Sequence, residues 1–448
     1  MVLGGWGRAP LAAVAAFRPE RVSELRQALI KTVESGTVAR GGGRSYGDQA
    51  LNAGGHVMLT ARLDRVLGFD RATGVLVAEP GLTFNDVLHL FLKHGWQAPV
   101  SPGTGFATLG GAVANDVHGK NHDRSGGFGD HVLWLDLMLA DGSTRRISPA
   151  EHEGLFRATI GGMGLTGVIT ALAVQLLKVP SNAVDLFERR IRDLDDFMTA
   201  LSDARATSFY SVGWIDALAR GRGLGRGILE TADPAPDGLP TTPPKSRRVP
   251  LDFPAVALNP LSVRLFNAAY YRRVPSRGRS RRVPTEKFLY PLDSLLDWNR
   301  IYGKRGFHQF QCVIPDGQAE RGIRALLEAI TGARAASFLA VLKTLGGEGR
   351  GLLSFPTRGF TLALDLPRRA DTPDLFGRLE HITLDHGGRI YLAKDALVSP
   401  AGFQRMYPRL SEFRAVLETV DPHGRFTSDM ARRLLLKPPH VQQVDRAA

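Results

Sequence analysis

Three consecutive glycines, Gly41 to Gly43, follow a short apolar segment and precede a stretch without helical periodicity. In "ARGGGRSYGDQALNAGG", residues 39–55, the first half of a G-x-G-x-x-G dinucleotide motif is present, but Tyr46 occupies the place of the third glycine. Without a following helix, no helix N-terminus is available to hold a pyrophosphate. Consecutive glycines can instead turn several backbone amides toward one anion, and Arg44 can add positive charge. A tight surface turn is the alternative interpretation of this segment.

A second glycine-rich passage, "PGTGFATLGGAVANDVHGKNHDRSGGFGDH", spans residues 102–131. A long passage of this kind inside a folded domain usually lines a ligand, and two such passages suit a long ligand with a pyrophosphate in its middle. His118 and His122 lack the helix and the glutamate of a zinc-protease motif, so we predict no metal site. A hydrogen-bonded structural role is the alternative for either histidine.

The length of 448 residues exceeds what one hydrophobic core usually supports, which predicts two domains. The net charge of +13 indicates an anionic partner: a nucleic acid, a phosphorylated substrate or an acidic membrane surface. The single cysteine, Cys312, excludes an intrachain disulfide and a cysteine-based zinc cluster. No signal peptide or membrane span is predicted, so we expect a cytoplasmic or peripheral membrane location, with the periplasmic side left open.

Apolar periodicity predicts an α+β fold. Strands are expected at 37–40, 56–59, 75–79, 132–140, 165–177 and 307–315, in "SFLAVLK" and in "FTLALDLP", with helices over 84–94, around 323–330 and over 373–386. Residues 233–285, rich in proline and arginine, are predicted to form mobile loops. Because these segments lack interleaved aromatic residues and a known motif, nucleic-acid binding is disfavoured. Gln309 and Gln311 are expected on one face of a strand, which could be solvated, and Phe310 and Cys312 on the other.

The chain resembles the vanillyl-alcohol-oxidase-like family of FAD enzymes and, within it, the oxidases of decaprenylphosphoryl ribose. The resemblance rests on "GGWGR", "ARGGGRSYGD", "PGTGFATLGGAVANDVHGKNH", "QFQCVIP", "YLAKD" and "SDMARRL", which occur in this order between residues 4 and 434. It implies a PCMH-type fold in which residues 1–181 and 389–448 form the FAD-binding domain. Residues 182–388 are then the substrate domain, with an antiparallel sheet.

The resemblance also implies an FAD site. Its residues are Arg40, Gly41, Gly42, Gly43, Arg44, Ser45, Tyr46, Gly47, Asp48, Gln49, Ala50, Gly103, Thr108, Leu109, Gly110, Gly111, Asn115, Asp116, Val117, His118, Ile169 and Tyr391. Tyr46 stands where several relatives carry a histidine bonded to the flavin, so the FAD is expected to be noncovalent. Ala363 and Thr361 stand where mycobacterial members carry a cysteine and an asparagine, so inhibitors that attack that thiol are expected to leave this chain unlabelled.

Oxidation of a secondary alcohol requires a hydride acceptor, a group that takes or relays the hydroxyl proton, and positive charge near the reduced flavin. Lys394 and Lys120 are the available cations. The resemblance places Lys394, His118 and Tyr46 at the sugar as catalytic residues. It places Lys120, Tyr290, Arg300, Gln309 and Gln311 around the sugar and its phosphate as substrate-binding residues; no general base is assigned.

The expected reaction converts the 2′-hydroxyl of a polyprenylphosphoryl-β-D-ribose to the 2′-keto sugar. A separate NAD(P)H-dependent short-chain reductase is the expected partner, and together the two enzymes would epimerise ribose to arabinose for cell-envelope glycans. The enzymatic alternative is an FAD-dependent oxidase of a soluble sugar or alditol. The non-enzymatic alternative is a basic nucleic-acid-binding protein.

Overall fold

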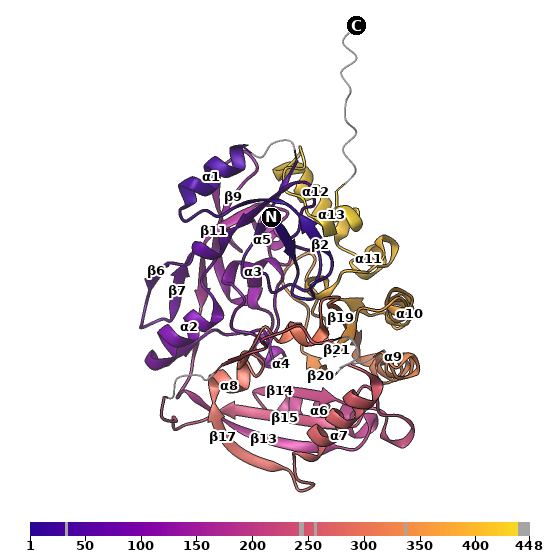
Figure 1. Cartoon of the computed structure of the whole chain (residues 1–448). Helices are drawn as coiled ribbons and strands as arrows, with labels where there is room; N and C mark the ends of the chain where they lie inside the picture. The colour runs from indigo at the N-terminus through magenta and orange to yellow at the C-terminus, as the bar shows by residue number, and fades with distance from the viewer. Residues whose placement is uncertain (32–34, 242–245, 255–257, 336–337, 438–448) are drawn as a thin grey trace.

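Two antiparallel sheets, one of five strands and one of eight, form the framework of the molecule. The computed structural model describes residues 1–31, 35–241, 246–254, 258–335 and 338–437. In Figure 1 the five-stranded sheet belongs to the indigo and purple N-terminal part, and the eight-stranded sheet to the magenta and orange part. Helices accompany both sheets, so the predicted α+β class is confirmed.

The strands are divided here at residue 180. Those before it are β1 (Val2–Gly4), β2 (Leu11–Ala13), β3 (Ala15–Phe17), β4 (Thr37–Arg40), β5 (His56–Leu59), β6 (Val66–Phe69), β7 (Val75–Ala78), β8 (Trp96–Gln97), β9 (Val132–Met138), β10 (Thr144–Ile147), β11 (Val168–Gln175) and β12 (Leu177–Lys178). Those after it are β13 (Ala183–Ile191), β14 (Tyr210–Ile215), β15 (Gly227–Pro234), β16 (Arg247–Arg248), β17 (Arg279–Pro284), β18 (Leu295–Leu296), β19 (Phe307–Pro315), β20 (Ala340–Leu345), β21 (Gly359–Pro367) and β22 (Arg389–Ile390).

The helices are distributed along the whole chain. They are α1 (Val22–Lys31), α2 (Phe84–Phe91), α3 (Leu109–Ala114), α4 (His122–Ser125), α5 (Glu153–Thr159), α6 (Leu194–Thr207), α7 (Pro260–Arg272), α8 (Thr285–Leu289), α9 (Ala319–Ala333), α10 (Thr372–Asp385), α11 (Pro400–Met406), α12 (Leu410–Val420) and α13 (Asp429–Arg433). The strand predictions at 37–40, 56–59 and 307–315 are confirmed residue for residue. The helix predicted over 84–94 begins at the Thr83–Asp86 capping box and ends at Gly95, which has a φ of 80°.

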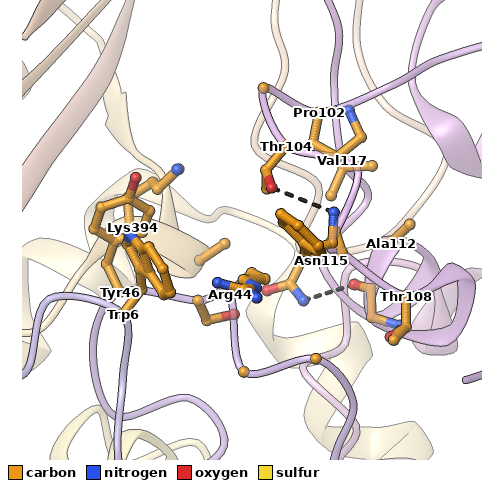
Figure 2. Close-up of a pocket in the computed structure, with 18 of the residues that line it drawn as sticks. Trp6, Arg44, Tyr46, Pro102, Thr104, Thr108, Ala112, Asn115, Val117 and Lys394 are labelled. Atoms are coloured by element: carbon orange, nitrogen blue, oxygen red, sulfur yellow. Dashed lines mark hydrogen bonds between the residues drawn. The ribbon is translucent and has the colours of Figure 1, made fainter. Parts of the chain in front are cut away.

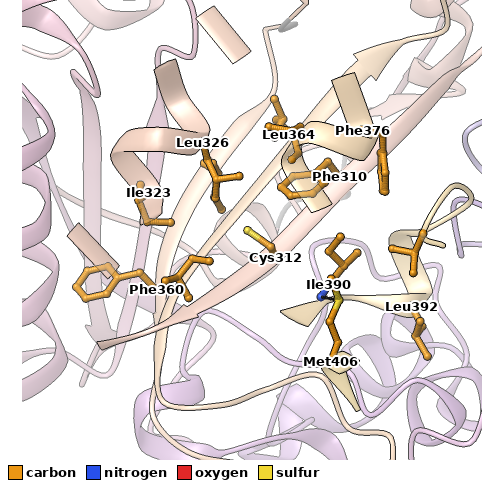
Figure 3. Packing of buried hydrophobic residues seen from close by; sticks show 14 of the residues in the cluster. Phe310, Cys312, Ile323, Leu326, Phe360, Leu364, Phe376, Ile390, Leu392 and Met406 are labelled. Atoms are coloured by element: carbon orange, nitrogen blue, oxygen red, sulfur yellow. Dashed lines mark hydrogen bonds between the residues drawn. The ribbon is translucent and has the colours of Figure 1, made fainter. Parts of the chain in front are cut away.

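The larger sheet has the strand order β17-β13-β15-β14-β20-β21-β19-β22. One of its faces packs against α6, α9 and α10, and Figure 3 shows Phe310 and Cys312 pointing into this apolar layer beside Leu326. Burial raises the pKa of the Cys312 thiol to about 12, so this cysteine is an inert core residue. Gln309 and Gln311 occupy the opposite face, as their alternation along β19 predicts, and both are buried.

The smaller sheet has the order β10-β9-β11-β7-β6, and beside it β3, β5 and β4 form a parallel three-stranded sheet. The C-terminal segment returns to this part of the molecule: Phe426 pairs with Thr37 of β4, and Arg433 bridges Asp48 and Asp395 at 2.8 Å each. This contact joins the two ends of the chain. The division into domains at residues 181 and 388 stays a prediction.

The prediction of mobile loops over residues 233–285 is wrong for its second half, while residues 242–245 and 255–257 lie outside the described part of the chain. Residues 260–272 form α7, and residues 279–284 form β17, the edge strand paired with β13. The reason is electrostatic. Glu188 of β13 is fully buried and binds Arg273 at 2.8 Å, Arg279 at 2.7 Å and Arg281 at 3.1 Å. Three of the arginines that suggested disorder therefore bind one buried carboxylate.

This cluster predicts a loss of stability on removal of the central charge. Glu188→Gln removes the anion bound by three guanidinium groups, of which only Arg273 keeps a second acidic partner among the described residues, Glu230, so we expect the free energy of unfolding to fall by about 3 kcal/mol. Asp185→Asn is the matched control, because Asp185 lies on the same strand, pairs with Arg282 and has a half-exposed side chain. Chemical denaturation measures both variants. Equal, small losses would contradict the role assigned to Glu188.

Candidate functional site

A cavity of about 660 Å³ lies between the glycine-rich loops of the first half and the face of the eight-stranded sheet that is turned away from α6, α9 and α10. Its volume is in the range of sites that enclose a small molecule or cofactor. On the sheet side, alternate residues face it: Val212 and Trp214 of β14, Val341 and Lys343 of β20, and Gln309 and Gln311 of β19. The polar face of β19 therefore lines a cavity between the two halves.

The three glycines are required by close packing at the end of β4. A Cβ at Gly41 would lie 2.2 Å from Oγ1 of Thr108, and a Cβ at Gly42 would lie 2.5 Å from the Phe106 carbonyl oxygen. Gly43 has a φ of 63°, which disfavours other residues. Within the described ranges, the backbone amides of residues 42–45 donate no hydrogen bond to protein. This loop is an amide-rich concavity of the kind that binds anions.

Polar atoms without protein partners gather on the same side of the cavity. Arg44 lies between two aromatic rings, 4.4 Å from the Trp6 centroid and 4.8 Å from that of Phe106, and its Nε is buried without a partner among described residues. Asn115 donates from Nδ2 to the Gly111 carbonyl at 2.7 Å, while its buried Oδ1 has no partner in the described part of the chain. A bound polar ligand would supply the hydrogen-bond partners that these buried atoms lack.

Figure 2 shows Tyr46 and Lys394 together at one end of the cavity, Thr108 and Asn115 at the other, and Arg44 between them. Nζ of Lys394 lies 3.9 Å from the centroid of the Tyr46 ring. Two elements far apart in sequence create this contact, because the Tyr46 amide donates to the carbonyl of Ala393 at 3.0 Å.

His118 is held by the sheet. Nε2 of Gln311 donates to Nε2 of His118 at 2.9 Å, so the neutral ring carries its proton on Nδ1, which has no partner among the described residues. Burial, followed by the charge of Lys343, pushes the pKa of His118 well below its ordinary value. His118 is therefore a neutral hydrogen-bonding group at neutral pH.

Three lysines face the cavity, and sequence analysis identified two of them. Burial lowers the pKa of Lys120 and of Lys343 to about 8 and that of Lys394 to about 7. Nζ of Lys120 donates to the Phe288 carbonyl, and Nζ of Lys343 donates to that of Gly119 at 3.3 Å. An isolated lysine in the otherwise apolar strand "AVLKTL" was the available signal for Lys343. Such a group of cations in a partly desolvated space favours an anionic ligand.

Asp365 is the second residue that sequence analysis missed. It is fully buried behind the cavity wall, where its carboxylate accepts from Nε2 of Gln309 at 2.6 Å and from the Tyr302 hydroxyl at 2.8 Å. Burial and the charge of Asp365 both raise the pKa of the Tyr46 hydroxyl. Burial raises the pKa of Asp365 to about 7. The charge of this carboxylate partly offsets the lowering of the Lys394 pKa by burial. The two groups are thus coupled acids and bases near neutral pH.

The structure brings most of the predicted site residues to this one cavity. Those that line it are Arg40 to Gly47, Gln49, Ala50, Gly103, Thr108, Gly110, Gly111, Asn115, Val117, His118, Lys120, Ile169, Gln309, Gln311, Tyr391 and Lys394, and Ala363 lies on the same wall.

Three residues predicted to contact FAD lie behind the cavity wall. Asp48 accepts two hydrogen bonds from Arg433, both at 2.8 Å. Asp116 accepts from the amide of Gly129 at 3.0 Å, and Leu109 is buried in the apolar core. Each supports a lining segment from behind, and its direct contact with FAD stays a prediction.

Two predicted substrate-binding residues are also displaced. The Tyr290 hydroxyl shares a hydrogen bond with that of Ser101 at 3.1 Å, and its ring is packed in the core. The guanidinium of Arg300 turns toward Asp252 at 3.4 Å and the carbonyl of Val249 at 3.2 Å. Neither residue lines the cavity, and the contact of each with substrate stays a prediction.

Comparisons with known proteins agree with this geometry. Residues 13–148 match the FAD binding domain family, and residues 362–434 match the D-arabinono-1,4-lactone oxidase family. The chain is 34% identical to decaprenylphosphoryl-beta-D-ribose oxidase of Mycolicibacterium smegmatis over 97% of both chains. It is 36% identical to an uncharacterised protein of Streptomyces coelicolor over 79% of this chain and all of that protein. It is 25% identical to an alditol oxidase of a Streptomyces species over 93% of this chain and 95% of that one.

The close approach at Gly41 predicts a variant that loses its flavin. Gly41→Ala places a methyl group against Thr108, which moves the amides of the loop, so we expect at least tenfold weaker flavin retention with an unchanged fold. Gly377→Ala is the control, because a Cβ there meets no atom within 4 Å. Absorbance of the purified proteins measures bound flavin, and circular dichroism measures folding. A Gly41→Ala protein that retains its full flavin absorbance would contradict the role of the glycine loop in binding the cofactor.

Proposed function

Because the chain belongs to the family of the decaprenylphosphoryl-β-D-ribose oxidases, we propose that it uses FAD to oxidise the 2′-hydroxyl of a polyprenylphosphoryl-β-D-ribose to the 2′-keto sugar. The chain is an FAD-dependent oxidoreductase that acts on sugar hydroxyls. The observation that carries the choice of substrate is the cavity, where the glycine loop faces three cationic side chains across one space. A sugar joined to a phosphate matches these cations.

The residues present fit the cofactor. The free amides of residues 42–45 and the guanidinium of Arg44 would hold the pyrophosphate, and Asn115 offers an unpaired oxygen to the flavin half. When bound, FAD supplies the ring that accepts the hydride. Tyr46, in the place of a covalently bonded histidine, leaves this FAD noncovalent.

The substrate phosphate is bound by Lys120 and Lys343. Both donate to backbone carbonyls on the cavity wall, which fixes where their charges lie. His118 and Gln311 orient the sugar, because the neutral imidazole keeps a free Nδ1–H donor and its other nitrogen is fixed by the amide. Orientation of this kind reduces the entropic part of the barrier.

Lys394 accepts the hydroxyl proton. Its pKa of about 7 leaves a large neutral fraction at physiological pH, and the amine that takes the proton becomes an ammonium. The Asp365 carboxylate stabilises that ammonium, and Gln309 and Tyr302 hold the carboxylate in place. The ammonium would then lie against the Tyr46 ring, and its positive charge would favour the anionic reduced form of a bound flavin.

The keto product requires a second enzyme. Reduction of the 2′-ketone with inverted configuration, by an NAD(P)H-dependent short-chain reductase, gives the arabinose epimer for cell-envelope glycans. The second candidate function is oxidation of a soluble alditol, which the similarity to the Streptomyces alditol oxidase favours. A phosphate-free alditol leaves Lys120 and Lys343 without an anion, and for that reason we rank it second.

Analysis of the product tests the proposal. Purified holoprotein is incubated with a short-chain polyprenylphosphoryl ribose, and the product is reduced with borodeuteride and hydrolysed. We expect deuterium at C2 in a mixture of ribose and arabinose. Deuterium at another carbon would contradict the assigned position, and faster turnover of xylitol or sorbitol than of the phospholipid sugar would favour the alditol candidate.

Substitution of Lys394 separates cofactor binding from chemistry. Lys394→Ala is expected to retain FAD and to lose at least 10²-fold in the rate of substrate-driven flavin reduction, because the proton acceptor is removed. Lys93→Ala, an exposed lysine on the surface, is the control. Anaerobic stopped-flow absorbance measures the rate. Unchanged reduction kinetics would remove Lys394 from the mechanism.

Substitution of Asp365 changes the pH dependence. Flavin reduction is expected to increase as pH rises through about 7, where the coupled groups lose their shared proton. In Asp365→Asn the carboxylate that raises the pKa of Lys394 is absent, so the apparent pKa falls by about one unit and the maximal rate also falls.

The exposed Asp64→Asn variant serves as its control. Rates of flavin reduction between pH 5 and 9, at fixed ionic strength, give the two profiles. An apparent pKa that is the same in Asp365→Asn as in the wild type would show that Asp365 does not act on Lys394.

A further inference from the structure

Exposed apolar side chains gather around α7 and the segment that precedes it. Leu251 is 71% exposed, Leu261 68%, Leu265 64%, Phe266 46% and Phe253 42%. Outside this region, the exposed large apolar residues of the described chain are scattered singly or in pairs. A group of this size on one face usually marks an interaction site.

The outward side of α7 is more apolar than that of an ordinary surface helix, although Val263 on its buried side packs in the core. Its buried side carries the polar Asn267, which donates to Asp216 at 2.7 Å, whereas Leu261 and Leu265, one turn apart, face outward beside the exposed Arg264. Surface helices normally place apolar residues inward and polar residues outward. The exposed leucines are therefore not needed for the internal packing of this helix.

A basic rim adjoins this apolar group. A second cavity, of about 480 Å³, is lined by Phe253, Leu258 and Ile301 together with Lys304, Arg305, Arg368 and Arg369. In the described chain, none of these four basic side chains forms an ion pair. The one acid of the rim, Asp252, is already bound by Arg8 at 2.5 Å. Apolar side chains bordered by unpaired cations match the surface of a bilayer that contains anionic lipid.

The same region borders the reaction cavity. Tyr270 of α7 contacts Trp214 with ring centroids 4.7 Å apart, and both line the reaction cavity. Trp298 lines the reaction cavity while Ile301, one turn later, lines the basic one. A polyprenyl tail leaving the reaction cavity on this side would meet the apolar face directly. Figure 1 places α7 at the end of the molecule opposite α1.

We propose that Leu251, Phe253 and the outward side of α7, with the rim of Lys304, Arg305, Arg368 and Arg369, dock on a bilayer containing anionic lipid and receive the substrate from it. This docking face rests on the proposed function, because the lipid tail of that substrate supplies the reason for it. Leu261 and Leu265 enter the interfacial layer, and the rim binds lipid phosphates. None of the described helices combines the length and apolar character needed to span a bilayer. Surface docking is thus the form of membrane contact that this face allows.

Vesicle binding tests the docking face. Holoprotein is sedimented with vesicles of phosphatidylcholine and phosphatidylglycerol at a ratio of 3:1. We expect Leu261→Asp/Leu265→Asp to bind at least tenfold more weakly than the wild type, and Arg368→Gln/Arg369→Gln to lose the preference over pure phosphatidylcholine. The matched control is Val66→Asp/Leu67→Asp, an exposed apolar pair on β6 that should bind like the wild type.

Two activity measurements separate this proposal from the proposed function. Leu261→Asp/Leu265→Asp should oxidise a dispersed short-chain substrate within twofold of the wild-type rate but lose most turnover of a long-chain substrate in vesicles. Wild-type protein that does not bind the vesicles, or a leucine variant that binds them as well as the wild type, would contradict the proposed docking face. So would wild-type dimerisation abolished by the leucine changes, which would assign the face to a second copy. Wild-type failure on the dispersed substrate would instead contradict the proposed function.

Discussion

The hydrogen bond from the Tyr46 amide to the Ala393 carbonyl joins segments about 350 residues apart, and the active cavity depends on it. Gly47 allows this approach, since a Cβ there would lie 1.9 Å from the carbonyl oxygen of Asp395. Gln49 adds a side-chain bond to the same carbonyl at 2.6 Å. The glycine loop and the turn that carries Lys394 are thereby held as one unit. Without this junction, the cofactor loop and the lysine would belong to separate surfaces.

The cavity obtains its chemistry from partial desolvation of charged groups. A lysine in water is protonated at neutral pH and cannot accept a proton, but burial brings the pKa of Lys394 to about 7. Burial brings the pKa of Asp365 to a similar value from the opposite direction. The Lys394 amine and the Asp365 carboxylate therefore have similar pKa values and can exchange one proton. The sheet makes this possible, because β19 and β21 present polar side chains on one face and pack against helices with the other.

Much of the site was predictable because the signals were local. The glycine run, the polar cluster near His118 and the alternation of Gln309 and Phe310 each concern neighbours in sequence, and geometry at that range follows from residue type. Lys343 and Asp365 were missed because their roles depend on strand order, which places β21 beside β19 and β20 beside β21. The sequence does not state that order.

Charged and polar residues were the hardest to assign from sequence. Arg300 and Tyr290 were predicted to bind the ligand; in the structure each contacts a nearby protein group, and their role stays a prediction. The arginines of β17 suggested a loop by composition, because the buried Glu188 that they neutralise lies about 90 residues earlier in the chain. A charged residue can be assigned only when its long-range partners are known. Glycine needs no such partner, and for that reason the glycine loop was the most informative feature.

The most direct measurement is the anaerobic half-reaction. Holoprotein is mixed without oxygen with one equivalent of a short-chain polyprenylphosphoryl ribose while the flavin band near 450 nm is followed. The proposed function predicts complete bleaching and one equivalent of 2′-keto sugar. A flavin that stays oxidised with this substrate, but bleaches with a phosphate-free sugar or alditol, would contradict the account of Lys120 and Lys343 as a phosphate site.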